Sequence, residues 1–405
     1  MVRVYGVTDA RVRPPVFDSI NRTNARPADH LETSFQFLNR VAGTYWAQVR
    51  QLVQEWLDRI ANDEDYRDLR GRLRSDNAAN YSAFLELYVH ELFRRAGYAV
   101  TIHPSLRGSS RRPDFLFEGH GQSFYVEATM PGPQGAAQGR SQRRAAFLDT
   151  IQRCSNRDFL LSLDQLIVGP TPARGRLVRR NIAHWLAGLD PEEVSYDLEG
   201  RETFRWEADG WEAEFSAIPV SPEHRGRRNY RPIGVYADGG VEFIDDAPAI
   251  RSALETKSTA YGGLDRPLII ALGTYIWDRD RWHSTNALYG HAAVTWSEGI
   301  DGTITHAGTR RPDGFFGTPN GRTNQGVSAV LHVNQLQPHH VQRAEVTLWP
   351  HPAAQDQLHA LVGRIPATTV RPSKDVLQET APTVDAADHF GLTDPWPVGE
   401  AFPHH

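Results

Sequence analysis

Residues 112–129 read RPDFLFEGHGQSFYVEAT, a pattern that predicts two short strands joined by a turn at 119–121. Each strand carries one carboxylate near an end: Asp114 directly follows a proline, and Glu127 lies in the run Val-Glu-Ala-Thr. Strands joined so tightly are antiparallel neighbours about 5 Å apart, so the two acids are expected to meet. Two carboxylates that close repel each other unless a cation or a proton lies between them. The pair is therefore a candidate cation site.

The ligand chemistry of this pair favours a hard divalent ion. Mg²⁺ takes one or two protein carboxylates and completes its coordination with water and substrate phosphate. Such a site favours metal-assisted phosphodiester hydrolysis, in which the metal polarises the phosphoryl group and helps to generate hydroxide. Mg²⁺, or Mn²⁺ in its place, is the expected cofactor.

The apolar pattern around this stretch predicts alternating helices and strands. A strong helix over residues 81–96 carries Glu86 and Glu91, and Gly97 ends it. We expect Glu91 to face solvent. The other predicted elements are one or two helices within 31–60, a strand over 98–103, a helix over 140–153, a strand over 159–168, a basic helix over 174–187, a hairpin turning at 208–210, a helix over 247–262 and a buried strand over 267–274.

Lys257 stands out in the helix over 247–262. It falls on the apolar face that Ile250, Leu254 and Tyr261 define. Among the 44 basic residues only two are lysines, Lys257 and Lys374, so lysine occurs where the broad arginine fork would not serve. An ammonium on an apolar face needs a carboxylate or a metal site as its partner.

The order of elements resembles that of the PD-(D/E)XK, or restriction-endonuclease-like, nucleases: a helix with a glutamate, a strand, a strand with Pro-Asp, a strand with Glu-x-x, a helix and a strand. The resemblance covers roughly residues 80–170 and 247–274. It implies an α/β protein with an α/β/α core around a mixed central sheet. It also implies that Asp114, Glu127 and the backbone carbonyl of Ala128 bind the metal, and that Glu86 assists through water.

The chain departs from the family pattern at Thr129, where the motif lysine is expected. Threonine can hold a water molecule but carries no charge. Either Lys257 supplies the missing ammonium from the following helix, or the chain is a catalytically inactive relative that binds nucleic acid or a partner protein. The first hypothesis requires the Lys257 ammonium to approach Glu127 within roughly 5 Å. A third interpretation is a structural αβ protein whose acids are solvated.

The sequence predicts four parts: an N-terminal arm with helices over 1–80, the nuclease-like core over 81–274 with an insertion at about 170–246, an additional β-rich segment over 275–362, and a poorly ordered tail over 363–405. The tail prediction follows from its richness in proline, threonine and aspartate.

Composition limits the partners. The net charge of -5 excludes a globally basic nucleic-acid binder, so phosphate contacts must come from local arginines. The expected ones are Arg111, Arg112, Arg140, Arg143 and Arg144, and the resemblance implies DNA as the substrate. The single Cys154 excludes an intramolecular disulfide, and no apolar run is long enough to span a bilayer. We therefore expect a cytoplasmic protein without membrane contact. Its oligomeric state is left open, a homodimer included.

Overall fold

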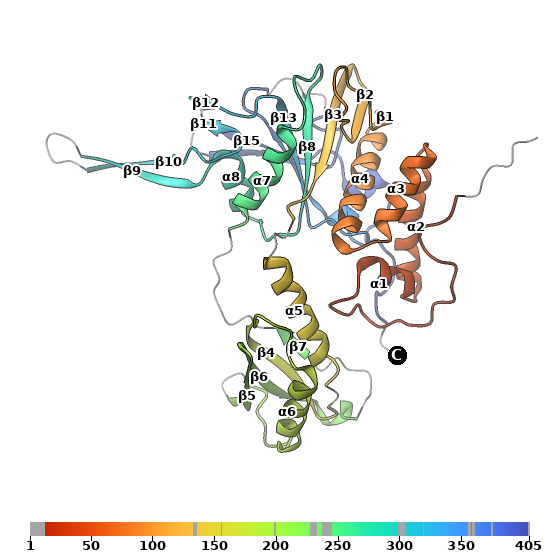
Figure 1. The fold of residues 1–405 in the computed structure, drawn as a ribbon, viewed down its shortest axis with the longest axis vertical. Helices are drawn as coiled ribbons and strands as arrows, with labels where there is room; N and C mark the ends of the chain where they lie inside the picture. The colour runs from red at the N-terminus through yellow and green to blue at the C-terminus, as the bar shows by residue number, and fades with distance from the viewer. Residues whose placement is uncertain are drawn as a thin grey trace, which may run out of the picture. The chain divides into compact units, whose positions relative to one another are not determined.

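The computed structural model describes residues 13–132, 136–154, 156–197, 200–226, 233–236, 245–298, 304–318, 320–354, 358, 361–373 and 376–403. The chain divides into two compact units. Unit 1 contains residues 1–27, 33–132 and 245–405, and unit 2 contains residues 28–32 and 133–244. Each unit has its own buried apolar cluster (Figure 1).

The described part of unit 1 begins with four helices, of which α1, α3 and α4 have a side-chain cap at the N-terminus. They are α1 (Ser34–Arg40), α2 (Thr44–Asp58), α3 (Asp63–Leu73) and α4 (Asn77–Arg95). Thr33 and Gln36 form a capping box at α1, and Asp76 accepts a hydrogen bond from the Ala79 N–H at the start of α4. The helices predicted within 31–60 and over 81–96 are confirmed. The helix predicted over 81–96 begins earlier than expected, because Asp76 caps it.

The main sheet of unit 1 is mixed. Within the described residues its eight strands follow the order β1-β2-β3-β8-β13-β14-β15-β16. Their bounds are Ala99–Ile102, Phe115–Gly119, Gln122–Thr129, Leu268–Thr274, Val327–Asn334, Glu345–Pro350, Thr368–Ser373 and Val376–Thr380. The first three strands are antiparallel, whereas β3 pairs with β8 and β8 with β13 in parallel. The expected α/β class with a mixed central sheet is confirmed.

Helices cover both faces of this sheet (Figure 1). On one face Phe93 of α4 packs against Phe117 and Phe124, with ring centroids 4.6 and 5.3 Å away. The opposite face carries α7 (Ala247–Ser258) and α8 (Trp282–Tyr289), and there Leu254 joins a buried cluster with Ile270. Because side chains alternate along a strand, each strand residue is assigned to the α4 face or the α7 face.

The C-terminal third of the chain differs from the expected separate segment and loose tail. Strands β13 and β14 continue the main sheet from β8. The tail is ordered through β15, β16 and α9 (Ala386–Phe390), so the prediction of a poorly ordered tail is wrong. Its Phe390 is buried and lies 5.4 Å from the Trp56 ring and 5.2 Å from the Tyr88 ring. This buried apolar contact orders the tail although its composition is polar.

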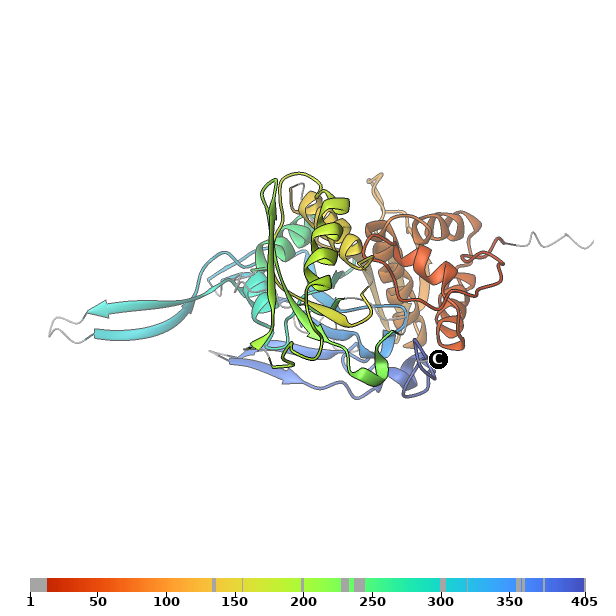
Figure 2. The ribbon, with the colours of Figure 1, turned by 90° about the horizontal axis from the view of Figure 1, so that it is seen from below.

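The remaining strands of unit 1 form two small hairpins outside the main sheet. They are β9 (Ala292–Glu298) with β10 (Ile304–Arg310), and β11 (Gly317–Thr318) with β12 (Gly321–Arg322). The β9–β10 hairpin projects away from the main sheet in both ribbon views (Figure 2).

Unit 2 is a small sheet with two helices on one face. Its elements are α5 (Ala136–Ile151), β4 (Phe159–Ile167), α6 (Gly175–Ala187), β5 (Thr203–Ala208), β6 (Trp211–Pro219) and β7 (Ile233–Tyr236), with strand order β5-β6-β4-β7. The predicted hairpin is confirmed: Asp209 and Gly210 turn it with φ values of 52° and 79°. The long segment of unit 2 begins at residue 133, so α5 and β4 belong to this unit and not to the core in which the sequence placed them.

None of the described helices combines the length and the apolar character that crossing a membrane requires.

Candidate functional site

The hairpin of β2 and β3 brings Asp114 and Glu127 together as the sequence predicts. His120 and Gly121 turn it with φ values of 52° and 72°, and Phe115 pairs with Val126. Asp114 and Glu127 are the next residues outward from that pair. Both lie on the α7 face, because their strand neighbours two residues away, Leu116 and Tyr125, belong to the cluster under that helix.

Hydrogen bonds tie each acid to the opposite strand. The Ala128 N–H donates to Asp114 Oδ2 at 2.7 Å, and the Asp114 N–H lies 3.3 Å from Glu127 Oε2. Glu127 is only 4% exposed. The two carboxylates are thus held at one end of the hairpin, in surroundings that keep most water out.

Lys257 approaches Glu127 directly. Its Nζ donates to Glu127 Oε1 at 2.5 Å, which confirms the predicted proximity. The Lys257 side chain is 30% exposed, so its ammonium also reaches solvent. Burial lowers the pKa of Lys257, but the hydrogen bond and charge of Glu127 and the charge of Asp114 outweigh it and leave the pKa raised. Lys257 is therefore a cation at neutral pH.

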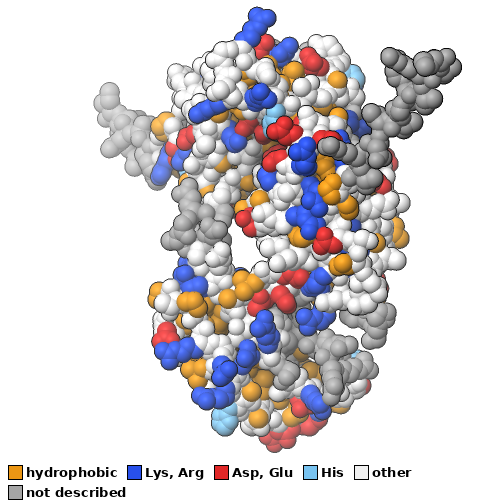
Figure 3. All heavy atoms as spheres, turned by 45° about the vertical axis from the view of Figure 1, so that its right-hand side comes forward, with side chains coloured by type: hydrophobic (Ala, Val, Ile, Leu, Met, Phe, Trp, Pro, Cys, Tyr) orange, Lys and Arg blue, Asp and Glu red, His pale blue; other side chains and the backbone are white. Residues whose placement is uncertain are grey.

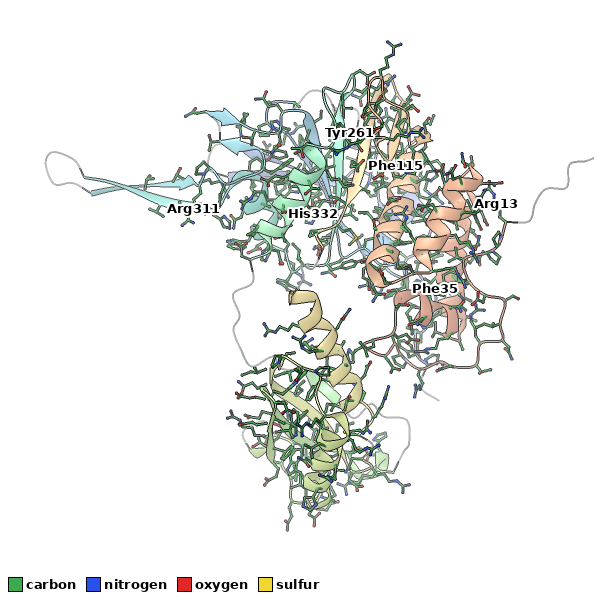
Figure 4. All side chains as sticks on the ribbon, in the orientation of Figure 1. Arg13, Phe35, Phe115, Tyr261, Arg311 and His332 are labelled. Carbon is green, nitrogen blue, oxygen red and sulfur yellow. The ribbon has the colours of Figure 1, made fainter. Side chains whose placement is uncertain are left out.

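Tyr261 also contacts Glu127, a role that the sequence did not reveal. Its hydroxyl donates to Glu127 Oε2 at 2.7 Å and lies 3.0 Å from the Arg112 carbonyl oxygen. Figure 4 labels Tyr261 among the side chains of unit 1. Tyr261 follows the end of α7, so the turn after the helix aims it at the site. Burial, and then the hydrogen bond and charge of Glu127, raise the pKa of Tyr261. The hydroxyl therefore stays a donor. The only signal for this contact was its place in the apolar series with Lys257.

Glu86 lies near the pair but is already engaged. Arg72 donates to both of its oxygens, at 2.7 and 2.6 Å, so neither points to Asp114 as a free ligand. Its charge still acts on Asp114. Glu91, expected in solvent, is fully buried and paired with three arginines, so that expectation is wrong.

Thr129 lies two residues after Glu127, on the same face of β3, and pairs with Leu272 of β8. The loop before β2 is tied to the end of α7, because Arg111 Nη1 donates to the Ala260 carbonyl oxygen at 2.8 Å. Arg111 and Arg112 therefore lie beside the site.

Arg140, Arg143 and Arg144 belong to α5 of unit 2, whereas the acids belong to unit 1. Arg143 Nε donates to the Gly169 carbonyl oxygen at 2.8 Å within unit 2. Within unit 1 the structure thus gathers Asp114, Glu127, Ala128, Thr129 and Lys257 in one place, and the three arginines belong to unit 2.

Asp114 has an unusual protonation equilibrium. Burial, and then the negative charges of Glu127 and Glu86, raise its pKa from 3.8 to about 7, although the Ala128 N–H and Lys257 act in the opposite direction. The folded chain therefore holds a proton on Asp114 that the unfolded chain releases near its ordinary pKa. The stability that this proton contributes is fully present at low pH and is lost as the pH rises from about 4 to about 7.

Replacing Asp114 with asparagine tests this equilibrium. Asp114→Asn is expected to raise the melting temperature of the metal-free protein at about pH 8 and to leave it nearly unchanged at about pH 4. The reason is that asparagine can still accept from the Ala128 N–H but carries no charge beside Glu127. The measurement is thermal unfolding followed by circular dichroism across this pH range.

Glu86→Gln is the matched control. Glu86 is the other acid near the site and, unlike Asp114, it is paired with an arginine. The substitution removes one charge from the pair with Arg72 and is expected to lower stability by about 1–3 kcal/mol at about pH 8. If both variants lowered the melting temperature at this pH, Asp114 would not be the destabilised carboxylate described above.

Two carboxylates, not three, form this site: among the described residues no group of three or more His, Cys, Asp or Glu side chains is arranged to hold a metal ion. The donors that this site offers are oxygens: Asp114 Oδ1, the backbone, and the lone pairs of the Glu127 oxygens that Lys257 and Tyr261 do not use. Such a donor set suits a magnesium ion that keeps several waters better than a zinc ion, which prefers nitrogen and sulfur.

Comparison with known proteins adds no relative: no family model, no curated protein and no solved structure matches the chain.

Proposed function

We propose that this chain is a metal-dependent nuclease that hydrolyses phosphodiester bonds in DNA at the site formed by Asp114 and Glu127. The observation that carries the proposal is the 2.5 Å contact between Lys257 Nζ and Glu127 Oε1. It places a cation beside the carboxylate where β3 itself offers only Thr129. The chain thus combines two acids and one lysine although its sequence motif lacks the lysine.

The chain order supports the same proposal. Helix α4 precedes the antiparallel strands β1, β2 and β3, and α7 leads into β8, which lies parallel to β3. This is the order that the resemblance to restriction-endonuclease-like cores implies, with unit 2 inserted between β3 and α7. It puts the acids and the lysine on one face of one sheet.

Asp114, Glu127 and the Ala128 carbonyl would hold the metal ion, Mg²⁺ or Mn²⁺. When bound, such an ion supplies a water of lowered pKa and neutralises charge on the phosphate. Binding requires Asp114 to lose its proton, so metal affinity rises as the pH passes about 7.

The other side chains have separate roles. Lys257 presents its ammonium to the negative charge that develops on the phosphate. Tyr261 fixes the orientation of Glu127 by donating to the oxygen that Lys257 does not contact. Glu86 acts on the site through its charge alone, because Arg72 occupies its oxygens.

A catalytically inactive protein that binds nucleic acid or a partner protein is the second candidate. Thr129 at the motif position, and only two clustered carboxylates among the described residues, favour it. The two candidates differ in one measurable property, because only the nuclease hydrolyses phosphodiester bonds.

Plasmid cleavage decides between them. Supercoiled DNA incubated with the full chain and Mg²⁺ or Mn²⁺ is expected to become nicked or linear, and a chelator is expected to stop the reaction. Asp114→Asn, whose fold is verified by thermal unfolding, is expected to lose the cleavage. Intact plasmid under every metal condition, or cleavage that survives in Asp114→Asn, would overturn the proposal.

A further inference from the structure

Charge is segregated within unit 2. Residues 136–187, which form α5, β4 and α6, contain nine arginines and three aspartates, a net charge of +6. Residues 188–244 contain six arginines and thirteen acids, a net charge of -7. Residues 136–244 thus carry a net charge of only -1, yet one part of this range is strongly basic.

In the folded unit the acidic and the basic residues lie on two different faces. On β6, Glu212 and Glu214 alternate with Ala213 and Phe215, whose side chains are buried under the helices. These glutamates therefore lie on the sheet face away from α5 and α6. The basic residues belong mainly to the helical layer, and Figure 3 shows arginine side chains gathered on part of this unit.

Helix α6 presents the clearest basic surface. Val178, Ile182 and Leu186 form its buried stripe, whereas Arg176 and Arg180 are exposed on the opposite side, one turn apart. Among the described residues neither arginine forms an ion pair, in contrast to Arg174, which pairs with Asp209 at 2.9 Å. Arg176 and Arg180 thus offer two uncompensated positive charges.

The acids within the basic part do not neutralise this surface. Asp149 accepts from the backbone N–H groups of His30 and Leu31, at 2.6 and 2.9 Å, and Asp164 accepts from the Ser162 hydroxyl at 2.6 Å. Charges on the two faces are separated by at least the thickness of a helix, about 10 Å. Salt screens charges over about 8–10 Å, so an anion at α6 responds to the arginines and not to the distant glutamates.

We infer that the exposed face of α6, defined by Arg176 and Arg180, binds the phosphate backbone of a nucleic acid. The choice of nucleic acid among polyanions rests on the proposed nuclease function. The face also carries Ala183, His184 and Ala187, which offer no bulky apolar side chain to insert into a membrane. The acidic sheet face repels the same polyanion, so unit 2 binds with its helical layer toward the phosphates.

The test measures binding of the full chain to a fluorescein-labelled DNA duplex of mixed sequence, in a chelator, by anisotropy at several salt concentrations. Arg176→Gln/Arg180→Gln is expected to weaken binding about ten-fold at low salt and to reduce the slope of log K against log salt by about 2, since each phosphate contact contributes about 0.9. Anionic lipid vesicles serve as the second polyanion.

The matched control is Arg201→Gln/Arg205→Gln, which removes the same charge from the strand side of unit 2. It is expected to leave affinity and slope unchanged. Equal losses in both double variants, no loss in the first, or binding to vesicles without binding to the duplex would overturn the inference. This outcome does not depend on catalysis. DNA binding without cleavage contradicts only the proposed nuclease function. Cleavage together with an unchanged slope of log K against log salt in Arg176→Gln/Arg180→Gln contradicts only the role of α6.

Discussion

Glu127→Gln is expected to reduce metal-dependent cleavage by at least about 10²–10³-fold, because glutamine removes the charge on which the site is built. Three groups converge on Glu127: the Lys257 ammonium, the Tyr261 hydroxyl and the Asp114 N–H. Glutamine matches glutamate in size, so the loss reports charge and not shape. Cleavage rates are measured on plasmid DNA at saturating Mg²⁺.

The same substitution also affects stability, so a second variant is needed. Without its counter-charge Lys257 is partly buried beside a neutral amide, at a cost of about 1–3 kcal/mol. Lys257→Met replaces the ammonium with an apolar group of similar length and is expected to lose cleavage; because it leaves the buried Glu127 carboxylate without its cation, its fold is verified by thermal unfolding. Tyr261→Phe keeps the charges and is expected to lose less. Cleavage retained in both Glu127→Gln and Lys257→Met would remove this pair from the mechanism.

Glu91→Gln is expected to lower the free energy of unfolding by about 3–5 kcal/mol at neutral pH, the cost of breaking a buried ion pair. The Glu91 side chain is fully buried, and its oxygens lie 2.6 Å from Arg59, 2.9 Å from Arg94 and 3.2 Å from Arg95. Removing its charge leaves the three guanidinium groups facing one another without compensation. This is the densest ionic cluster around α4.

The pH dependence of this effect follows from the Glu91 pKa. Burial raises it, but the neighbouring His90, the hydrogen bond from Arg94 and the charge of Arg59 outweigh burial and lower the pKa from 4.5 to about 2. An acid whose pKa is lowered in the folded chain stabilises the fold above its unfolded pKa. This stabilisation is lost as the pH falls from about 4.5 to about 2. The loss in free energy of unfolding that Glu91→Gln causes is therefore expected to become smaller as the pH falls over that range.

Chemical denaturation at several pH values measures this difference. Glu55→Gln on α2 is the matched control: Glu55 is exposed and accepts only from Gln51, so its loss is expected to change stability by less than about 0.5 kcal/mol. Equal effects of the two variants, or an effect of Glu91→Gln that does not depend on pH, would show that the arginine cluster does not stabilise the fold through charge.

The parts of the site that sequence reasoning recovered are those set by local spacing. The turn at 119–121 fixes which residues of β2 and β3 oppose each other, and the helical period fixes which face Lys257 occupies. The partner of Lys257 could be inferred because an apolar face allows few alternatives for an ammonium. The alternation of apolar residues likewise predicted most helices and strands.

The parts that it missed depend on contacts between distant segments. Glu86 is engaged by Arg72 of another helix, and Tyr261 reaches the site only through the turn after α7. The Arg72 contact has no local signature, and the place of Tyr261 in the apolar series does not reveal Glu127 as its partner. The tail is ordered because Phe390 reaches Trp56, far along the chain, and no composition measure reveals such a partner.

The insertion of unit 2 has a consequence for how the site assembles during folding. Glu127 and Lys257 are 130 residues apart in sequence, so their ion pair closes a very long chain loop. The entropy cost of closure grows only with the logarithm of loop length, and each doubling adds about 0.6 kcal/mol. Exchanging unit 2 for a shorter or longer segment therefore changes the thermodynamic cost of joining β3 to α7 only slightly. The two halves of the site can thus remain partners while the segment between them changes in size.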